Sequence, residues 1–91
     1  MSEQQTQHVR ILYFAWVREK VGQGEEEIAL PATVATVADV IAWLKTRGPQ
    51  FDEAFARPET VRAALDKVYV KPSAPIAGAR EIAFFPPVTG G

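Results

Sequence analysis

The sequence predicts an α+β domain in which one main helix packs on one sheet, and three segments support this prediction. Residues 9–16, VRILYFAW, place apolar side chains on both faces of an extended chain, as expected of a central strand. Residues 80–85, REIAFF, also alternate, and a Pro-Pro pair ends this strand. Between them an apolar stripe recurs at helical spacing, formed by Val37, Val40, Ile41 and Leu44. Strands on both sides of one helix indicate an α+β arrangement.

Length and composition limit the chain to one small domain. Its 91 residues, 47% hydrophobic and 23% charged, provide for a single core. Lys and Arg number 10 and Asp and Glu 11, so neither nucleic acid nor an anionic membrane is expected as a partner. The absence of cysteine excludes disulfides, thiolate metal sites and cysteine nucleophiles. The polar start and the short apolar run 11–17 predict a cytoplasmic protein without a membrane span.

Two strands are expected in the first third of the chain. Residues 1–8 are polar and Gln-rich, which predicts a disordered tail before strand 9–16. One or two helical turns then end at Gly22, a residue suited to a left-handed cap. Residues 25–30, EEEIAL, alternate weakly and predict a second strand. The two strands are expected to form an antiparallel hairpin.

The clearest helix contains the apolar stripe. Thr36 and Asp39 match a capping box at its start, and the Gly48-Pro49 pair is expected to end it. Trp43 lies at the edge of the stripe, where packing over the core is favoured over a ligand role. Residues 51–55 carry two phenylalanines one turn apart, which predicts a short second helix.

Residues 58–70, PETVRAALDKVYV, carry conflicting signals. Good helix formers and Pro58 in a plausible first turn favour a helix. The segment VYV, residues 68–70, favours a strand. The local pattern therefore predicts a helix followed by a strand.

Most familiar catalytic motifs are absent, so the C-terminal end is the candidate site. His8, the single histidine, lies in the predicted tail, and neither a metal site nor a histidine base is expected. The Gly-Gln-Gly of residues 22–24 fits a turn, and the glutamates of residues 25–27 fit a solvated strand edge. Gly90 and Gly91 remain as the unusual chemical group.

A Gly-Gly end has two interpretations, a frayed terminus or a thin segment that threads into the active site of another protein. The α-carboxylate of Gly91 has an ordinary pKa of about 3.5, so it is anionic and needs activation before it reacts. A partner that uses ATP could form an acyl adenylate, from which an amine or a sulfur nucleophile displaces AMP. Pro86 and Pro87 end the strand, so the flexible segment is expected to begin at Val88.

Residues 81–91, EIAFFPPVTGG, resemble the C-terminus of the MoaD-type sulfur carriers, the small subunits of molybdopterin synthase. Residues 11–22, ILYFAWVREKVG, resemble the apolar strand and turn near the start of those proteins. The resemblance implies a ubiquitin-like β-grasp fold over residues 9–87 with a flexible Gly-Gly tail, residues 88–91. It also implies two short strands, 62–65 and 67–70, in place of the helix that local propensity predicts.

The resemblance further implies a mechanism and three partners. Gly91, preceded by Gly90, would be adenylated by a ubiquitin-activating-like adenylyltransferase that uses ATP, and would receive sulfur from a persulfide donor as a thiocarboxylate. The tail would then enter the large catalytic subunit, where the thiocarboxylate attacks cyclic pyranopterin monophosphate to build the dithiolene. The chain would bind no cofactor or metal itself and would be no enzyme on its own.

The partner-binding residues implied by the resemblance surround the tail. They are Phe14, Tyr69, Phe85, Pro86, Pro87, Val88, Thr89 and Arg18. The alternative for the three aromatic residues is a place in the core, and for Arg18 a solvated surface. The chain departs from the family at Asp66, where similar proteins often carry Asn, and at residues 78–80, where they have an acidic turn. Both departures bear on partner affinity rather than on the reacting end.

Three other functions stay open at this point. One is a sulfur carrier for thiamine or for a thiolated tRNA base, which uses the same terminal chemistry with other partners. The second is a ubiquitin-like modifier joined through Gly91 to lysines, which would give conjugates of high mass in cell extracts. The third is an interaction domain with an inert tail, for which removal of the two glycines would have no effect.

Overall fold

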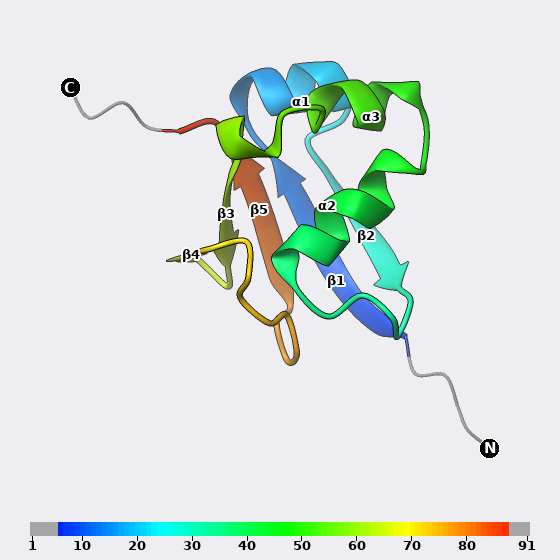
Figure 1. Ribbon diagram of the computed structural model, residues 1–91, viewed down its shortest axis with the longest axis vertical. Helices are drawn as coiled ribbons and strands as arrows, with labels where there is room; N and C mark the ends of the chain where they lie inside the picture. Colours follow the sequence, from blue (N-terminus) through cyan, green and yellow to red (C-terminus); the bar gives the residue numbers. More distant parts are fainter. Residues whose placement is uncertain (1–5, 88–91) are drawn as a thin grey trace.

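The computed structural model describes residues 6–87 and contains one five-stranded mixed sheet in the order β2-β1-β5-β3-β4 (Figure 1). The strands are β1 (Gln7–Tyr13), β2 (Glu25–Leu30), β3 (Arg62–Leu65), β4 (Val68–Val70) and β5 (Glu81–Phe85). β1 runs parallel to β5, and the other neighbours are antiparallel. The expected hairpin of β1 and β2 is confirmed. This is the β-grasp arrangement that the resemblance implies, and it places β5, which leads to the C-terminal tail, in the middle of the sheet.

The helices all lie on one face of the sheet (Figure 1). They are α1 (Ala15–Val21), α2 (Val37–Lys45), α3 (Pro49–Ala54) and the 3₁₀ turn η1 (Pro58–Thr60). α2 crosses the sheet, whereas α1 and α3 pack together at the end where β5 finishes. The opposite face of the sheet has no helix over it within the described residues, and it is called the open face below.

The core fills the space between the sheet and the helices. Alternation on β1 directs Val9, Ile11 and Tyr13 to the helices, and all three are buried. On β5 the buried residue Phe84 contacts Phe55 edge-on, with ring centroids 5.2 Å apart. The predicted stripe of α2 is buried as expected, and Trp43 is partly buried against the core.

The start of α2 is held by the predicted capping box. The Asp39 backbone N–H donates to the Thr36 hydroxyl at 3.2 Å, and the Thr36 backbone N–H donates to the Asp39 carboxylate at 3.1 Å. Backbone donors from Ala35 and Thr36 lower the pKa of Asp39. The other end differs from the prediction, because α2 stops at Lys45 and the Gly48-Pro49 pair instead begins α3.

Two predicted boundaries near the N-terminus are wrong. Gln7 and His8 belong to β1 rather than to a disordered tail, because they pair with Leu30 and Ala29 of β2. The Gln7 side-chain amide also donates to the carbonyl oxygens of Ile76 and Ala79, at 2.7 and 3.0 Å. The strand then ends at Tyr13 instead of residue 16.

The end of β1 is set by an unusual backbone conformation. Ala15 has a φ of 54°, in the left-handed region, so the chain leaves the sheet and α1 begins there. Gly22, with a φ of 93°, ends α1 as predicted, and its backbone N–H donates to the Arg18 carbonyl at 2.8 Å. Nothing in the composition of VRILYFAW indicates a left-handed alanine. The prediction therefore extends the strand to residue 16, three residues beyond its end at Tyr13.

The conflicting segment 58–70 forms two strands, as the resemblance implies, and the local prediction of a helix is wrong. Pairing with the central strand β5 decides the outcome, since β3 lies between β5 and β4. β4 begins at Val68 rather than at Lys67, because Asp66 and Lys67 form the turn with φ values of 48° and 74°. The Asp66 carboxylate accepts from the backbone N–H groups of Arg80 and Glu81, both at 3.0 Å.

We expect Asp66→Ala to lower the free energy of unfolding by about 1–3 kcal/mol, because it removes two hydrogen bonds and places alanine at a positive φ. Asp66→Asn keeps an acceptor oxygen and tolerates the left-handed conformation, so its stability should stay within about 0.5 kcal/mol of the unmodified protein. Urea unfolding of the three proteins measures both effects. Equal losses for alanine and asparagine would show that the two bonds from Arg80 and Glu81 do not hold this turn.

Candidate functional site

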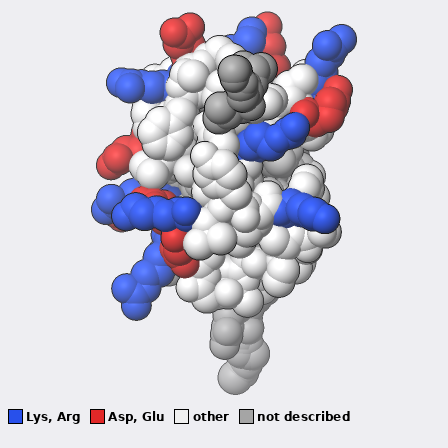
Figure 2. Space-filling view, turned by 90° about the vertical axis from the view of Figure 1, so that its left-hand side faces the viewer, with Lys and Arg blue, Asp and Glu red and all other residues white. Residues whose placement is uncertain are grey.

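The open face of the sheet carries an apolar groove of about 350 Å³ beside the end of β5. Its apolar lining comes from β1, β3, β4, β5 and the residue after β1. The lining residues are Leu12, Phe14, Ala64, Tyr69, Ala83 and Phe85, with Lys67 and Glu81 at one edge. Figure 2 shows a band of uncharged surface on the side of the molecule where β4 lies, with charged residues to either side.

The strand register explains why these residues meet. Leu12 pairs with Ala83, Ala83 with Ala64, and Ala64 with Tyr69, so a single row crosses four strands on the open face. The next row toward the tail contains Phe85. Because side chains alternate, the neighbouring positions on β1 and β5 point into the core instead.

The three aromatic residues predicted to dock a partner all line this groove. Phe14 is 47% exposed and Tyr69 72% exposed, so neither fills the core. Phe85 is half-buried, and its ring centroid lies 5.2 Å from that of Tyr69. Large exposed aromatic side chains grouped in one groove are typical of an interaction surface.

The outward position of Phe14 results from the turn into α1. Its backbone N–H donates to the Phe84 carbonyl at 3.0 Å, which continues the pairing of β1 with β5 by one residue. Its carbonyl oxygen accepts from Val17 and Arg18, at 3.1 and 3.3 Å, in the first turn of α1. The left-handed Ala15 between these contacts is a strained position of the kind that is found at functional sites.

Val68 is a second exposed apolar residue of β4, and its exposure was not predicted from the sequence. Val68 is 63% exposed, and it neighbours Tyr69 on the strand but points to the opposite side. Its exposure follows from the position of β4 at the edge of the sheet. The short VYV segment predicts a strand but gives no signal that this strand lies at an edge.

A partly buried polar cluster was also missed. Glu26 was predicted to lie on a solvated strand edge, but its side chain is only 14% exposed and accepts from the Tyr13 hydroxyl and from Arg47, both at 2.8 Å. The Arg47 guanidinium carbon lies 4.8 Å from the Phe51 ring centroid. Glu26 is in phase with Ile28 and therefore faces the helices. This alternation with Ile28 is the feature of the sequence that indicates the inward position of Glu26.

The cluster predicts a pH dependence of stability at alkaline pH. Burial and the neighbouring Glu26 raise the pKa of Tyr13 above its ordinary value of 10.0. A raised folded-state pKa gives stability that is complete below the unfolded pKa, and this stability is lost as the pH rises beyond it. We therefore expect Tyr13 to reduce the free energy of unfolding by up to about 1.4 kcal/mol per pH unit above about pH 10.

Urea unfolding from about pH 9 to about pH 11 measures this slope. Tyr13→Phe should flatten it, whereas the matched variant Tyr69→Phe, at an exposed tyrosine, should leave it unchanged. Identical slopes for the unmodified protein and Tyr13→Phe would contradict the assignment.

Comparison with known proteins identifies the family. The model of the ThiS family matches residues 11–91. The chain belongs to the ThiS family. A molybdopterin synthase sulfur carrier subunit of Mycosarcoma maydis is 34% identical, over 94% of this chain and 96% of that protein. The molybdopterin synthase sulfur carrier subunit of Escherichia coli K12 is also 34% identical, over 91% of this chain and 99% of that protein.

A solved structure agrees with this ThiS-family fold. A Pyrococcus furiosus protein described as molybdopterin converting factor, subunit 1, superposes with a TM-score of 0.68 at 30% identity. The superposition covers 89% of this chain and 98% of that protein. The β-grasp fold implied by the terminal motif is thereby confirmed.

Not every predicted site residue of this ThiS-family chain lies at the groove. Pro86 and Pro87 follow β5 and are half-buried, whereas Val88, Thr89, Gly90 and Gly91 lie outside the described residues. Arg18 is exposed on α1 and is not part of the groove lining; its guanidinium lies against Gly24. Within residues 6–87 no three Asp, Glu or His side chains gather as a metal site, and none of the helices there is long and apolar enough to cross a membrane.

Proposed function

We propose that this chain is the sulfur carrier subunit of a molybdopterin synthase. The observation that carries the proposal is the 34% identity to two molybdopterin synthase sulfur carrier subunits over at least 91% of the chain. The family match extends to Gly91, so it includes the Gly-Gly pair whose chemistry the proposal uses. The apolar groove beside the end of β5 is structural support for the proposal, because it offers a docking surface next to the strand that leads to the tail.

The chemistry takes place on the carboxyl group of Gly91. In the active site of an activating partner this carboxylate attacks the α-phosphorus of ATP, releases pyrophosphate and becomes a glycyl adenylate, since a free carboxylate is a poor electrophile. The terminal sulfur of a persulfide donor then attacks the acyl carbon and displaces AMP, which gives an acyl disulfide. A thiol reductant cleaves its S–S bond, and the product is a thiocarboxylate. In the assembled synthase the thiocarboxylate sulfur attacks cyclic pyranopterin monophosphate, and hydrolysis of the resulting thioester returns the Gly91 carboxylate. Two such transfers supply the two sulfur atoms of the molybdopterin dithiolene. ATP binds the activating partner, and this chain binds no cofactor.

The large subunit supplies the catalytic acids, bases and substrate contacts, while this chain supplies sulfur and a docking surface. Phe14, Tyr69 and Phe85 contact the large subunit, because they expose aromatic surface in one groove next to the strand that leads to the tail. Pro86 and Pro87 stiffen the exit, and residues 88–91 extend from it into the active site of the large subunit. Arg18 contributes at most at the rim.

Reconstitution tests the function directly. The carrier is charged with ATP, the adenylyltransferase and a persulfide donor, and is then mixed with the large subunit and cyclic pyranopterin monophosphate. Dithiolene formation in proportion to charged carrier is the expected result. A carrier that is charged but gives no product here, and instead thiolates a thiamine precursor or a tRNA base, would move the chain to another sulfur pathway. Transfer of Gly91 to lysines would indicate a protein modifier.

A further inference from the structure

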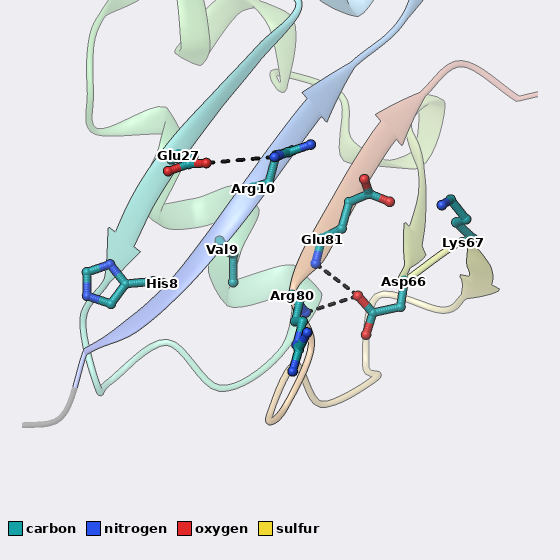
Figure 3. Close-up of a pocket in the computed structure, with 8 residues that line it drawn as sticks. All are labelled: His8, Val9, Arg10, Glu27, Asp66, Lys67, Arg80 and Glu81. Atoms are coloured by element: carbon teal, nitrogen blue, oxygen red, sulfur yellow. Dashed lines mark hydrogen bonds and ion pairs between the residues drawn. The ribbon is translucent and has the colours of Figure 1, made fainter.

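A second groove of about 630 Å³ adjoins the apolar groove on the open face (Figure 3). Its lining comes from β1, β2, the β3–β4 turn, Arg80 and the start of β5. The lining residues are His8, Val9, Arg10, Glu27, Asp66, Lys67, Arg80 and Glu81. Lys67 and Glu81 also line the apolar groove, so the two hollows form one continuous surface.

The strand register places this charged groove next to the apolar rows, on the side toward the start of β1 and β5. Arg10 pairs with Glu81 on β5 and with Glu27 on β2, and the next open-face row contains Leu12 and Ala83. Successive rows on one face are about 7 Å apart. The open face thus changes from charged to apolar within one row.

A partner that covers the apolar rows must extend beyond them. Those rows measure roughly 15 Å by 10 Å, from strands about 4.8 Å apart and rows about 7 Å apart. A standard protein–protein interface buries about 800 Å² of each partner, several times that footprint. The charged groove is the adjoining part of the same sheet face, and it therefore lies within reach of the partner.

The charges of this groove differ in how far they are already neutralised. Arg10 forms an ion pair with Glu27 at 3.8 Å, and Asp66 accepts two backbone hydrogen bonds. The side chains of Lys67 and Arg80 have no carboxylate within ion-pair distance among residues 6–87. Within that part of the chain the Glu81 carboxylate also has no ion pair, so the groove leaves two cations and one anion to interact with a partner.

We propose that the charged groove is the second half of the docking interface, and that the large subunit places carboxylates against Lys67 and Arg80. This inference rests on the proposed function. The apolar half supplies most of the affinity, because aromatic side chains lose their water there. The charged half accelerates association and disfavours partners that present positive charge to it.

Association kinetics with the purified large subunit test the proposal. At low ionic strength Lys67→Glu and Arg80→Glu should each lower the association rate constant about tenfold, and the rate should lose most of its dependence on salt. Dissociation and conversion of Gly91 to the thiocarboxylate should change little. Lys67→Gly, which suits a φ of 74°, removes the charge without disturbing the turn and should give a smaller loss of the same kind.

Lys45→Glu is the control for charge, since it makes the same charge change on α2, which lies on the helical side of the sheet. It also breaks the ion pair of Lys45 with Asp52 at 3.9 Å, so urea unfolding is used to check that this variant is folded. It should associate at close to the unmodified rate. Equal slowing by Lys45→Glu, or unchanged rates for Lys67→Glu and Arg80→Glu, would overturn the inference while the carrier function stands. Failure of the unmodified charged carrier to bind the large subunit at all would instead overturn the proposed function, and the inference with it.

Discussion

Deletion of Gly91 is expected to abolish the gain in mass that marks thiocarboxylate formation. The unmodified protein, incubated with ATP, the activating enzyme and a sulfur source, should gain the mass difference between a sulfur and an oxygen atom. Without Gly91 the terminal carboxylate belongs to Gly90 and sits about 3.3 Å short of its normal position. A displacement of about 1 Å at a reacting centre can cost about 100-fold in rate, so this loss of reach should leave no detectable product.

A chain that begins at Thr6 is the matched control, because it loses residues at the other end and keeps both glycines. It should be converted as fast as the unmodified protein. A full gain in mass by the protein lacking Gly91 would show that sulfur is attached elsewhere. No gain by the unmodified protein, with an activating enzyme shown to be competent, would contradict the carrier function.

Much of the helical layer could be predicted from local pattern alone. The stripe from Val37 to Leu44 and the capping box of Thr36 depend on contacts within a few residues, so the sequence displays them directly. The strands depend on distant pairing. Residues 62–65 have good helical propensity, yet they form β3 because they pair with the central strand β5. Only the resemblance of the terminal motif supplied that information.

The candidate site was predictable in its members but not in its extent. Phe14, Tyr69 and Phe85 were named from the resemblance, and the register of β1, β5, β3 and β4 explains how residues so far apart in sequence share a groove. The left-handed Ala15, which turns the chain after Phe14, has no signature in an apolar segment. The charged groove could not be predicted from the sequence, because its residues lie on four separate segments, each with ordinary surface composition.

Tyr69→Glu is expected to weaken the complex with the large subunit about 100-fold or more while leaving the carrier folded. Tyr69 is 72% exposed, so the free protein loses little buried area, and only the contact with Phe85 is disturbed. In the complex a tyrosine at the centre of an apolar contact contributes about 2 kcal/mol or more, and a carboxylate buried there adds a desolvation cost. Calorimetry of binding, with circular dichroism of the free carrier, measures both quantities.

Val68→Glu separates loss of docking from general damage to β4. Val68 is 63% exposed on the same three-residue strand, but strand alternation points it away from the groove. Both variants place a carboxylate on an edge strand, where it costs the fold little, so they should unfold at similar urea concentrations. Only the Tyr69 variant should lose the large subunit. Unfolding of the Tyr69 variant would assign this residue to the core, and equal binding by both variants would place the docking surface elsewhere on the carrier.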